Sequence, residues 1–151
     1  MINKNTFFAA TFTFLFVCMA AAAWAAEKNC NDAKGEFADF LKLMERKSHN
    51  SLGEIYDTYT LATCSRKSFI KRLKNKQKDM HKFAIDACRA KGSTYFKNNK
   101  ALGFTIHITY WNRNKSSYEE FGPYGKSFSF YYLLEKHVWV VPDYSISRLL
   151  D

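Results

Sequence analysis

The stretch that most constrains the fold of this chain is residues 126–144, which read KSFSFYYLLEKHVWVVPDY. Aromatic side chains alternate with smaller ones over its first half, and this period of two is typical of a β-strand with one buried face. A polar break at residues 135–137 separates this run from a second short run at residues 138–141, so we predict a β-hairpin. The alternation assigns to the predicted core face Phe128, Phe130, Tyr132 and Leu134, and to the opposite face Ser127, Ser129, Tyr131 and Leu133.

Two more strands are predicted upstream of the hairpin. Residues 103–111 alternate between large apolar side chains and a second set that contains Thr105, His107 and Trp111. Residues 82–89 fit either the end of a helix or a strand, and their alternation favours a strand. The polar segments at residues 92–93 and 97–100 are predicted to be loops.

The first half of the chain after residue 26 has helical periodicity. Apolar residues at positions 37, 40, 41 and 44 predict a helix that is capped by Asn31 or Asp32 and runs to about Lys47. Residues 51–54, SLGE, match a capping box and predict a second helix that ends near residues 60–63. A third helix is predicted to begin at Ser65, with an apolar inner face that continues toward residue 84.

The outer face of this third helix carries a basic stripe. Its members recur at spacings of three and four: Lys67, Lys71, Lys74, Lys78 and Lys82. Such a face can lie on an anionic membrane surface or meet an acidic partner. The alternative is a solvated helix face with no partner.

The N-terminus is predicted to direct export. Lys4 precedes an uncharged apolar run at residues 6–24, and Ala23-Trp24-Ala25 fits the small-residue rule for signal-peptide cleavage. We therefore expect a signal peptide over residues 1–25 and a single domain over residues 26–151, in the periplasm or secreted. An uncleaved membrane anchor is the alternative for this run. After export and removal of Lys4, 22 basic and 14 acidic residues remain, and this charge of about +8 points to anionic surfaces or to solubility and not to nucleic acid.

The cysteine pattern is consistent with an exported domain. Cys30, Cys64 and Cys88 remain after removal of the signal peptide, enough for one disulfide and one free thiol. If the first two helices fold back on each other, the end of the second returns toward the start of the first, so we predict a Cys30–Cys64 disulfide. The spacing lacks the close pairs of a zinc site, and we expect neither a metal nor a cofactor.

Helices followed by antiparallel strands define an α+β fold: two or three N-terminal helices packed on a curved antiparallel sheet of three or four strands. In two segments the chain resembles the NTF2-like, or cystatin-like, α+β cone. Residues 53–73 match its paired helices through Tyr56, Tyr59 and Phe69, and Trp139-Val140-Val141 lies at the place of its closing strand. The turn at residues 135–137 departs from the Gly-rich turn of that family. The resemblance implies a fold and, more narrowly, small exported bacterial proteins of unknown function, but no activity, because this fold hosts many functions.

Candidate chemistry is sparse. His107 and Asp86 on neighbouring strands are weak candidates for a proton-transferring pair inside the cone, and the alternative is a strand histidine and a surface acid. A binding role has more support, because aromatic side chains crowd the C-terminal half. We predict that four residues on one face line a cavity or an interface: His107, Trp111, Tyr131 and Trp139.

The predicted function is therefore an exported, non-enzymatic NTF2-like domain that binds a small apolar ligand or a protein partner. The alternative is an inhibitor or immunity-type protein that blocks an exported enzyme, and an enzyme with a His–Asp dyad comes third. A hollow cone would favour the carrier or the enzyme, and a filled cone with an exposed aromatic or charged patch would favour the inhibitor. The aromatic strands also permit a homodimer.

Overall fold

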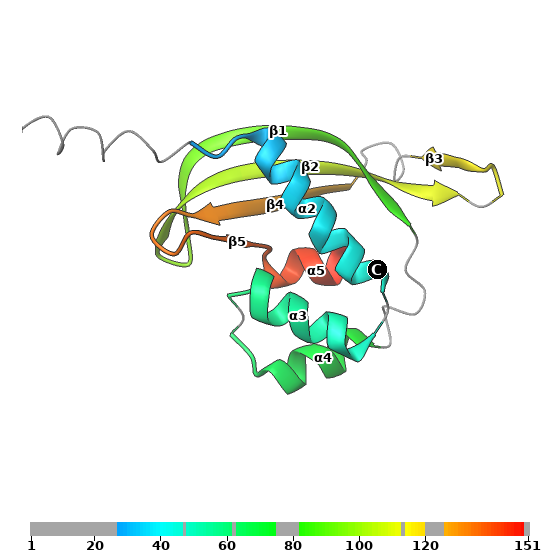
Figure 1. The fold of residues 1–151 in the computed structure, drawn as a ribbon, viewed down its shortest axis with the longest axis horizontal. Coiled ribbons are helices and arrows are strands. Elements are labelled where there is room, and N and C mark those ends of the chain that lie inside the picture. The colour runs from blue at the N-terminus through cyan, green and yellow to red at the C-terminus, as the bar shows by residue number, and fades with distance from the viewer. Residues whose placement is uncertain are drawn as a thin grey trace, which may run out of the picture.

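The computed structural model describes residues 27–46, 48–61, 63–74, 82–112, 114–119 and 126–149. The predicted signal peptide and Lys78 lie outside these residues. In chain order, the described elements are α2 (Cys30–Glu45), α3 (His49–Tyr59), α4 (Arg66–Lys74), β1 (Phe83–Phe96), β2 (Asn99–Asn112), β3 (Ser117–Glu119), β4 (Lys126–Leu133), β5 (Val138–Val140) and α5 (Asp143–Leu149). They form an α+β fold in which a curved antiparallel sheet arches over the helices, as Figure 1 shows. None of the described helices is both long and apolar enough to cross a membrane.

Helix α2 lies across the inner face of the sheet (Figure 1). Asn29, and not Asn31 or Asp32, caps it: the Asn29 side chain accepts from the amide of Asp32, and the Asp32 carboxylate accepts from the amide of Asn29. Its apolar stripe is buried, and the Phe37 ring lies 5.3 Å from that of Phe130 and 6.2 Å from that of Phe128, between ring centroids. The predicted helix and its inner face are therefore confirmed.

Helix α3 starts earlier than its sequence suggests. Ser48 is the cap, and Ser51 is its partner in the capping box: the Ser51 amide donates to Ser48 Oγ at 3.0 Å, and the Ser48 amide donates to Ser51 Oγ at 3.2 Å. The predicted box with Ser51 as the cap is wrong, because the helix begins three residues earlier and Ser51 is its N3 residue, whose amide donates to Ser48.

Helix α4 packs on α3 through Tyr56 and Phe69, whose rings meet edge to face at 5.3 Å. Its predicted inner face is confirmed as far as residue 74, since Phe69, Ile70 and Leu73 are buried. The predicted continuation to Ala84 is wrong, because Ala84 lies in β1. The predicted extension of the basic stripe to Lys82 is wrong. Lys82 adjoins β1, where its carbonyl accepts from the Trp111 amide, because residues 83–89 form a strand as their alternation predicts.

The sheet has the strand order β1-β2-β4-β5, with β3 paired to the far end of β2. Strands β1 and β2 form a long hairpin whose turn residues, Lys97 and Asn98, both have positive φ, as a two-residue type I′ turn requires. The predicted loop at residues 92–93 is wrong: these residues continue β1 through a β-bulge, where Gly92 has φ of +78°. A second bulge leaves Asp86 without a partner in the register.

The predicted hairpin of residues 126–141 is confirmed as β4 and β5. Phe128 and Phe130 are buried against the helices, as predicted, whereas Leu134 lies in the turn and is 36% exposed. Trp139 is on the inner face and not, as predicted, on the face of Tyr131. It pairs with Tyr132 across the hairpin, and directly paired residues share a face of a sheet. Its ring stacks on Phe130 at 4.8 Å.

After β5 the chain forms helix α5, where the sequence suggested only a tail. Ile146 and Leu149 of this helix are buried in the core. The Val141 amide donates to the carbonyl of Tyr59 at 2.7 Å, which ties the end of the sheet to α3.

The predicted Cys30–Cys64 disulfide is wrong: Cys30 is bonded to Cys88, and Cys64 is a partly buried free thiol. Helix α2 has 16 residues and α3 has 11, so their lengths are about 24 Å and about 17 Å. The end of α3 therefore falls short of the first turn of α2. That turn lies instead over β1, where Cys88 pairs with Ile106 and faces the helices.

Candidate functional site

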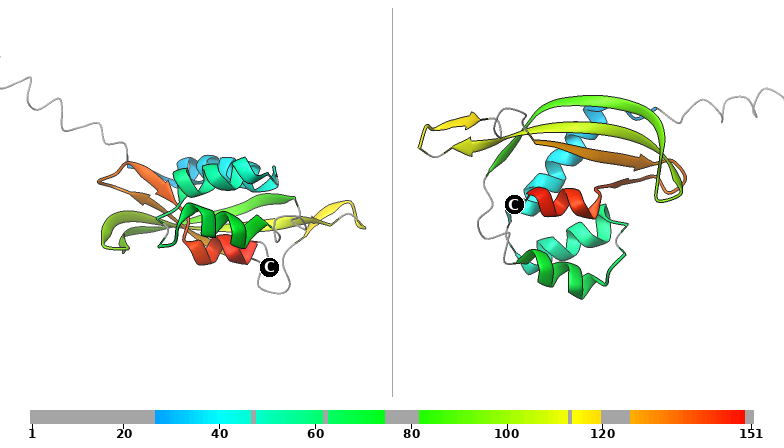
Figure 2. Two further views of the ribbon diagram at one scale, coloured as in Figure 1. Left: turned by 90° about the horizontal axis from the view of Figure 1, so that it is seen from below. Right: turned by 180° about the vertical axis from the view of Figure 1, so that it is seen from behind.

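The candidate site is the outer face of the sheet, by which we mean the side turned away from α2. The view from behind in Figure 2 (right) shows β1, β2 and β4 in front of α2, and no described helix lies over their middle. Strand alternation brings to this face Arg89 from β1, Thr105, His107, Thr109 and Trp111 from β2, and Ser127, Ser129 and Tyr131 from β4.

The central part of the outer face is formed by three small hydroxyl side chains and His107, and we call it the hydroxyl floor. Thr105 pairs with Ser129 and His107 pairs with Ser127 across β2 and β4, and all four side chains are partly buried. Short side chains keep the floor low, and hydroxyls both donate and accept hydrogen bonds. This floor can therefore bind polar groups along its length.

His107 sits in this floor with Ser127 as its partner, since Ser127 Oγ lies 2.8 Å from His107 Nδ1. A serine within hydrogen-bond reach of a histidine is a possible nucleophile with its base. Acyl transfer would also need free backbone amides to stabilise an oxyanion, and β2 is paired on both edges beside His107. Among the described residues, no carboxylate bonds to His107.

Asp86, the other half of the predicted dyad, lies at a bulge of β1 and is exposed. The described part of the chain shows no hydrogen bond or ion pair between Asp86 and His107. Sequence alternation already places Ser127 on the face opposite the core. Its pairing with His107 depends on the register of β2 and β4, which the sequence does not reveal.

An aromatic pair stands at each end of the floor. Trp111 meets Tyr118 of β3 edge to face at 5.0 Å, and Tyr118 is 48% exposed. At the other end Tyr131 stacks on Phe96 at 4.6 Å. Two of the predicted aromatic residues, Trp111 and Tyr131, therefore share the outer face with His107, and Trp139 does not.

The Tyr131 end is supported by a second, smaller core. Ala101, Leu133 and Val140 are fully buried there, and the partly buried Leu61 packs against them. The Lys97 ammonium donates to the carbonyl of Leu61 and lies over the ring of Phe96. The hairpin tip is thereby fixed to the loop after α3, which holds this aromatic pair in place.

Glu119 stabilises the Trp111 end. It accepts from Lys115 Nζ and from Asn112 Nδ2, both at 2.8 Å, and from the hydroxyl of Tyr110 at 3.2 Å. These hydrogen bonds lower the pKa of Glu119, and the bond from Lys115 has the largest effect. The short strand β3 is thus held to β2 by side-chain hydrogen bonds as well as by the backbone pairing of the two strands.

The outer face is basic. Arg89 pairs with Thr105 and is exposed. Lys91 lies next to Gly103, because a Cβ on that glycine would be 3.4 Å from Lys91 Cβ and 3.5 Å from the ring of Tyr131. Two cations therefore border the hydroxyl floor on its β1 side.

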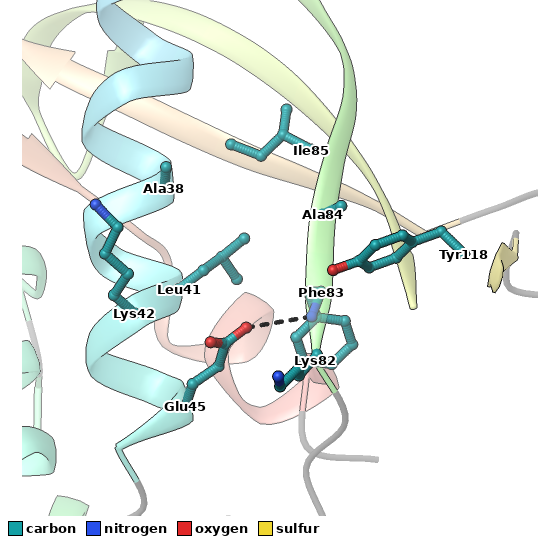
Figure 3. A pocket seen from close by; sticks show the side chains of 9 residues that line it. All are labelled: Ala38, Leu41, Lys42, Glu45, Lys82, Phe83, Ala84, Ile85 and Tyr118. Carbon is teal, nitrogen blue, oxygen red and sulfur yellow. Dashed lines mark hydrogen bonds between the residues drawn. The ribbon is translucent and has the colours of Figure 1, made fainter. Parts of the chain in front are cut away.

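A cleft of about 430 Å³ runs between α2 and the start of β1, and Figure 3 shows its lining, which includes Tyr118. Its one carboxylate, Glu45, accepts from the Phe83 amide at 3.3 Å, and Lys42 and Lys82 lie near its rim. The carboxylate of the cleft is thus bound to the backbone of β1.

The remaining predicted residues lie elsewhere. Lys67, Lys71 and Lys74 are exposed on α4, at the side of the molecule away from the sheet (Figure 1). No three metal-ligating side chains converge within the described residues. Comparisons with protein-family models, with curated proteins and with solved structures gave no match. The candidate site is therefore identified from its geometry.

Proposed function

We propose that this protein is an exported, non-enzymatic binding module that holds an acidic protein partner against the outer face of its sheet. The observation that carries the proposal is the hydroxyl floor between two aromatic pairs, Trp111–Tyr118 and Phe96–Tyr131. Aromatic side chains offer large, rigid contact area, and a floor of hydroxyls supplies hydrogen bonds around it, as protein interfaces use.

A ligand inside the fold is the weaker possibility, because aromatic rings pack between α2 and the middle of the sheet. Phe37, Phe130 and Trp139 form a continuous contact there, with ring centroids 5.3 Å and 4.8 Å apart, and Phe104 lies 5.5 Å from Trp139. Ring packing of this kind disfavours a small apolar molecule at this place in the fold. Binding at the surface is therefore favoured over carriage in a cavity.

Charge favours an acidic partner over a second copy of the chain. The chain has a formal net charge of +9, and Arg89 and Lys91 border the floor. Like charges oppose self-association, and complementary charge accelerates encounter with an acidic protein. An inhibitor or immunity-type protein is the narrower form of this proposal, in which the partner is an exported enzyme.

Export and the NTF2-like cone belong to the same proposal. The Cys30–Cys88 disulfide supports export, since such bonds persist in oxidising compartments. A curved sheet with a long helix across its inner face supports the resemblance to the cone.

The test uses a charge-matched pair of variants. Arg89→Glu/Ser129→Glu places carboxylates on both sides of Thr105, whereas Lys136→Glu/Thr58→Glu makes the same change of charge on exposed residues elsewhere. Partners captured from the extracytoplasmic fraction are identified by mass spectrometry, purified, and titrated against each variant. We expect the outer-face variant to raise Kd at least tenfold and the control to change it less than twofold.

Equal affinity of the two variants for every captured partner would overturn the proposal. A homodimer in sedimentation equilibrium that only the outer-face variant dissociates would assign the face to a second copy, and would also overturn it. Loss of a partner's enzymatic activity on binding would identify the protein as an inhibitor.

A further inference from the structure

A hollow of about 500 Å³ lies between the start of α3 and the outer side of α4, and we call it the α3–α4 hollow. Six residues line it: His49, Arg66, Lys67, Ile70, Lys71 and Lys74. All of them except Ile70 can carry a positive charge. The hollow is remote from the outer face, because α3 and α4 lie at the side of the molecule away from the sheet (Figures 1 and 2).

The helix geometry of α4 explains why the lysines gather. Phe69, Ile70 and Leu73 are buried against α3, so the opposite side of the helix faces solvent. Positions 67, 71 and 74 follow the i, i+4, i+7 spacing and therefore lie on one face. All three lysines are exposed, and within the described part of the chain none has an ion-pair partner.

The nearby acids do not neutralise these lysines. The Asp57 carboxylate is bound by Arg66 Nε, at 3.1 Å and 3.2 Å to its two oxygens. Glu54 lies 3.8 Å from Arg46, and α4 itself contains no acidic residue. Among the described residues no carboxylate is paired with these lysine ammonium groups, which repel one another, and an anion in the hollow would relieve that repulsion.

The shape of the hollow indicates the size of the anion. The floor is Ile70, which is 3% exposed, and the lysine stems form the walls. Ammonium groups on flexible stems are common ligands of phosphate. A volume of about 500 Å³ accommodates a phosphate group with a small substituent.

We infer that the α3–α4 hollow is a binding site for a phosphate group, carried either by a small soluble molecule or by the headgroup of an anionic phospholipid. Lys67, Lys71 and Lys74 supply the charge, and Ile70 and the lysine stems contact the substituent. The inference is independent of the outer face, since no residue is shared between the two sites.

The experiment compares two triple variants of the purified protein. Lys67→Gln/Lys71→Gln/Lys74→Gln removes three charges from the hollow, and Lys34→Gln/Lys100→Gln/Lys136→Gln removes three from other surfaces. The probes are inorganic phosphate and pyrophosphate, measured by calorimetry, and vesicles of phosphatidylglycerol in phosphatidylcholine, measured by co-sedimentation. All measurements are made at one ionic strength, and thermal unfolding checks that both variants fold.

We expect saturable binding of at least one probe, weakened at least tenfold by the hollow variant and less than twofold by the control. Binding of pyrophosphate alone would assign the site to a soluble phosphate, and binding of vesicles alone would assign it to a lipid headgroup. Equal weakening by both variants would mean attraction to net charge only and would overturn the inference. Absence of saturable binding to every probe at millimolar concentration would overturn it as well.

Discussion

Cys30, the first residue of α2, is joined to Cys88 in β1, with their Cα atoms 5.8 Å apart. The bond closes a loop of sequence separation 58 that contains α2, α3 and α4. It therefore attaches the helical half of the fold directly to the sheet. Removing it by Cys30→Ser/Cys88→Ser should lower the free energy of unfolding by about 2–4 kcal/mol, because the unfolded chain regains loop entropy.

Urea unfolding measures this loss, and Cys64→Ser is the control, since Cys64 takes no part in the disulfide. A non-reduced digest should contain a peptide that joins Cys30 to Cys88. A Cys64 to Cys88 peptide, or equal stability of the double variant and the wild type, would contradict the assignment.

A pair of glycine substitutions should have opposite effects. Gly92 has φ of +78° in the β1 bulge, a conformation that costs other L-residues about 1–2 kcal/mol, so Gly92→Ala should destabilise by that amount. Gly35 is exposed in α2, and a Cβ added there would have no neighbour within 4 Å, so Gly35→Ala should stabilise by up to about 1 kcal/mol. Denaturant midpoints compare the two, and a stabilising Gly92→Ala would show that the bulge does not need its glycine.

The two tryptophans on opposite faces of the sheet should respond differently to truncation. Trp139→Ala removes a ring that packs on Phe104 and Phe130 and should destabilise by about 3–5 kcal/mol. Trp111→Ala removes only a partly buried ring paired with Tyr118 and should destabilise by about 1 kcal/mol. Chemical denaturation measures the free energy of unfolding of both variants. Equal losses of stability would argue against the inner position of Trp139.

Stability should decline at alkaline pH through Tyr59. Burial, and then the hydrogen bond that the Tyr59 hydroxyl donates to Glu36, raise the pKa of Tyr59. An unfolded tyrosine loses its proton near pH 10, whereas the folded one keeps it, so the unfolded state binds fewer protons and stability falls as pH rises above about 10. Below that pH the contribution of the Tyr59 hydroxyl to stability is fully present.

Melting temperatures between pH 8 and 11 measure the effect. Tyr59→Phe should flatten the decline, and Tyr95→Phe should leave it unchanged, because Tyr95 is 68% exposed. Parallel curves for the wild type and both variants would exclude Tyr59 as the source.

The sequence predicted those features that depend on local periodicity. Phe128 and Phe130 face the core as their alternation indicates, and the inner face of α4 follows its helical spacing. Trp139 was misplaced because its face depends on the number of residues in the turn before it, which alternation within either strand does not reveal.

Contacts between residues far apart in the chain could not be predicted from the sequence for a related reason. The partner of Cys30 depends on how α2 crosses the sheet, and the contact of Ser127 with His107 depends on the register of β2 and β4. Neither the path of α2 across the sheet nor the register of the strands produces a periodic pattern in the sequence. The unequal lengths of α2 and α3 could have warned against a Cys30–Cys64 bond, since the shorter helix does not return to the start of the longer one.

The bulges at Asp86 and Gly92 have a consequence for how other chains can approach this sheet. Strand β1 is an edge strand of 14 residues, and a flat edge of that length would offer its unpaired amides and carbonyls as a template for a foreign strand. The two irregularities break that template into short pieces, because each one bends the strand and disrupts the spacing of its hydrogen-bonding groups. We therefore expect β1 to pair poorly with the edge strand of another chain.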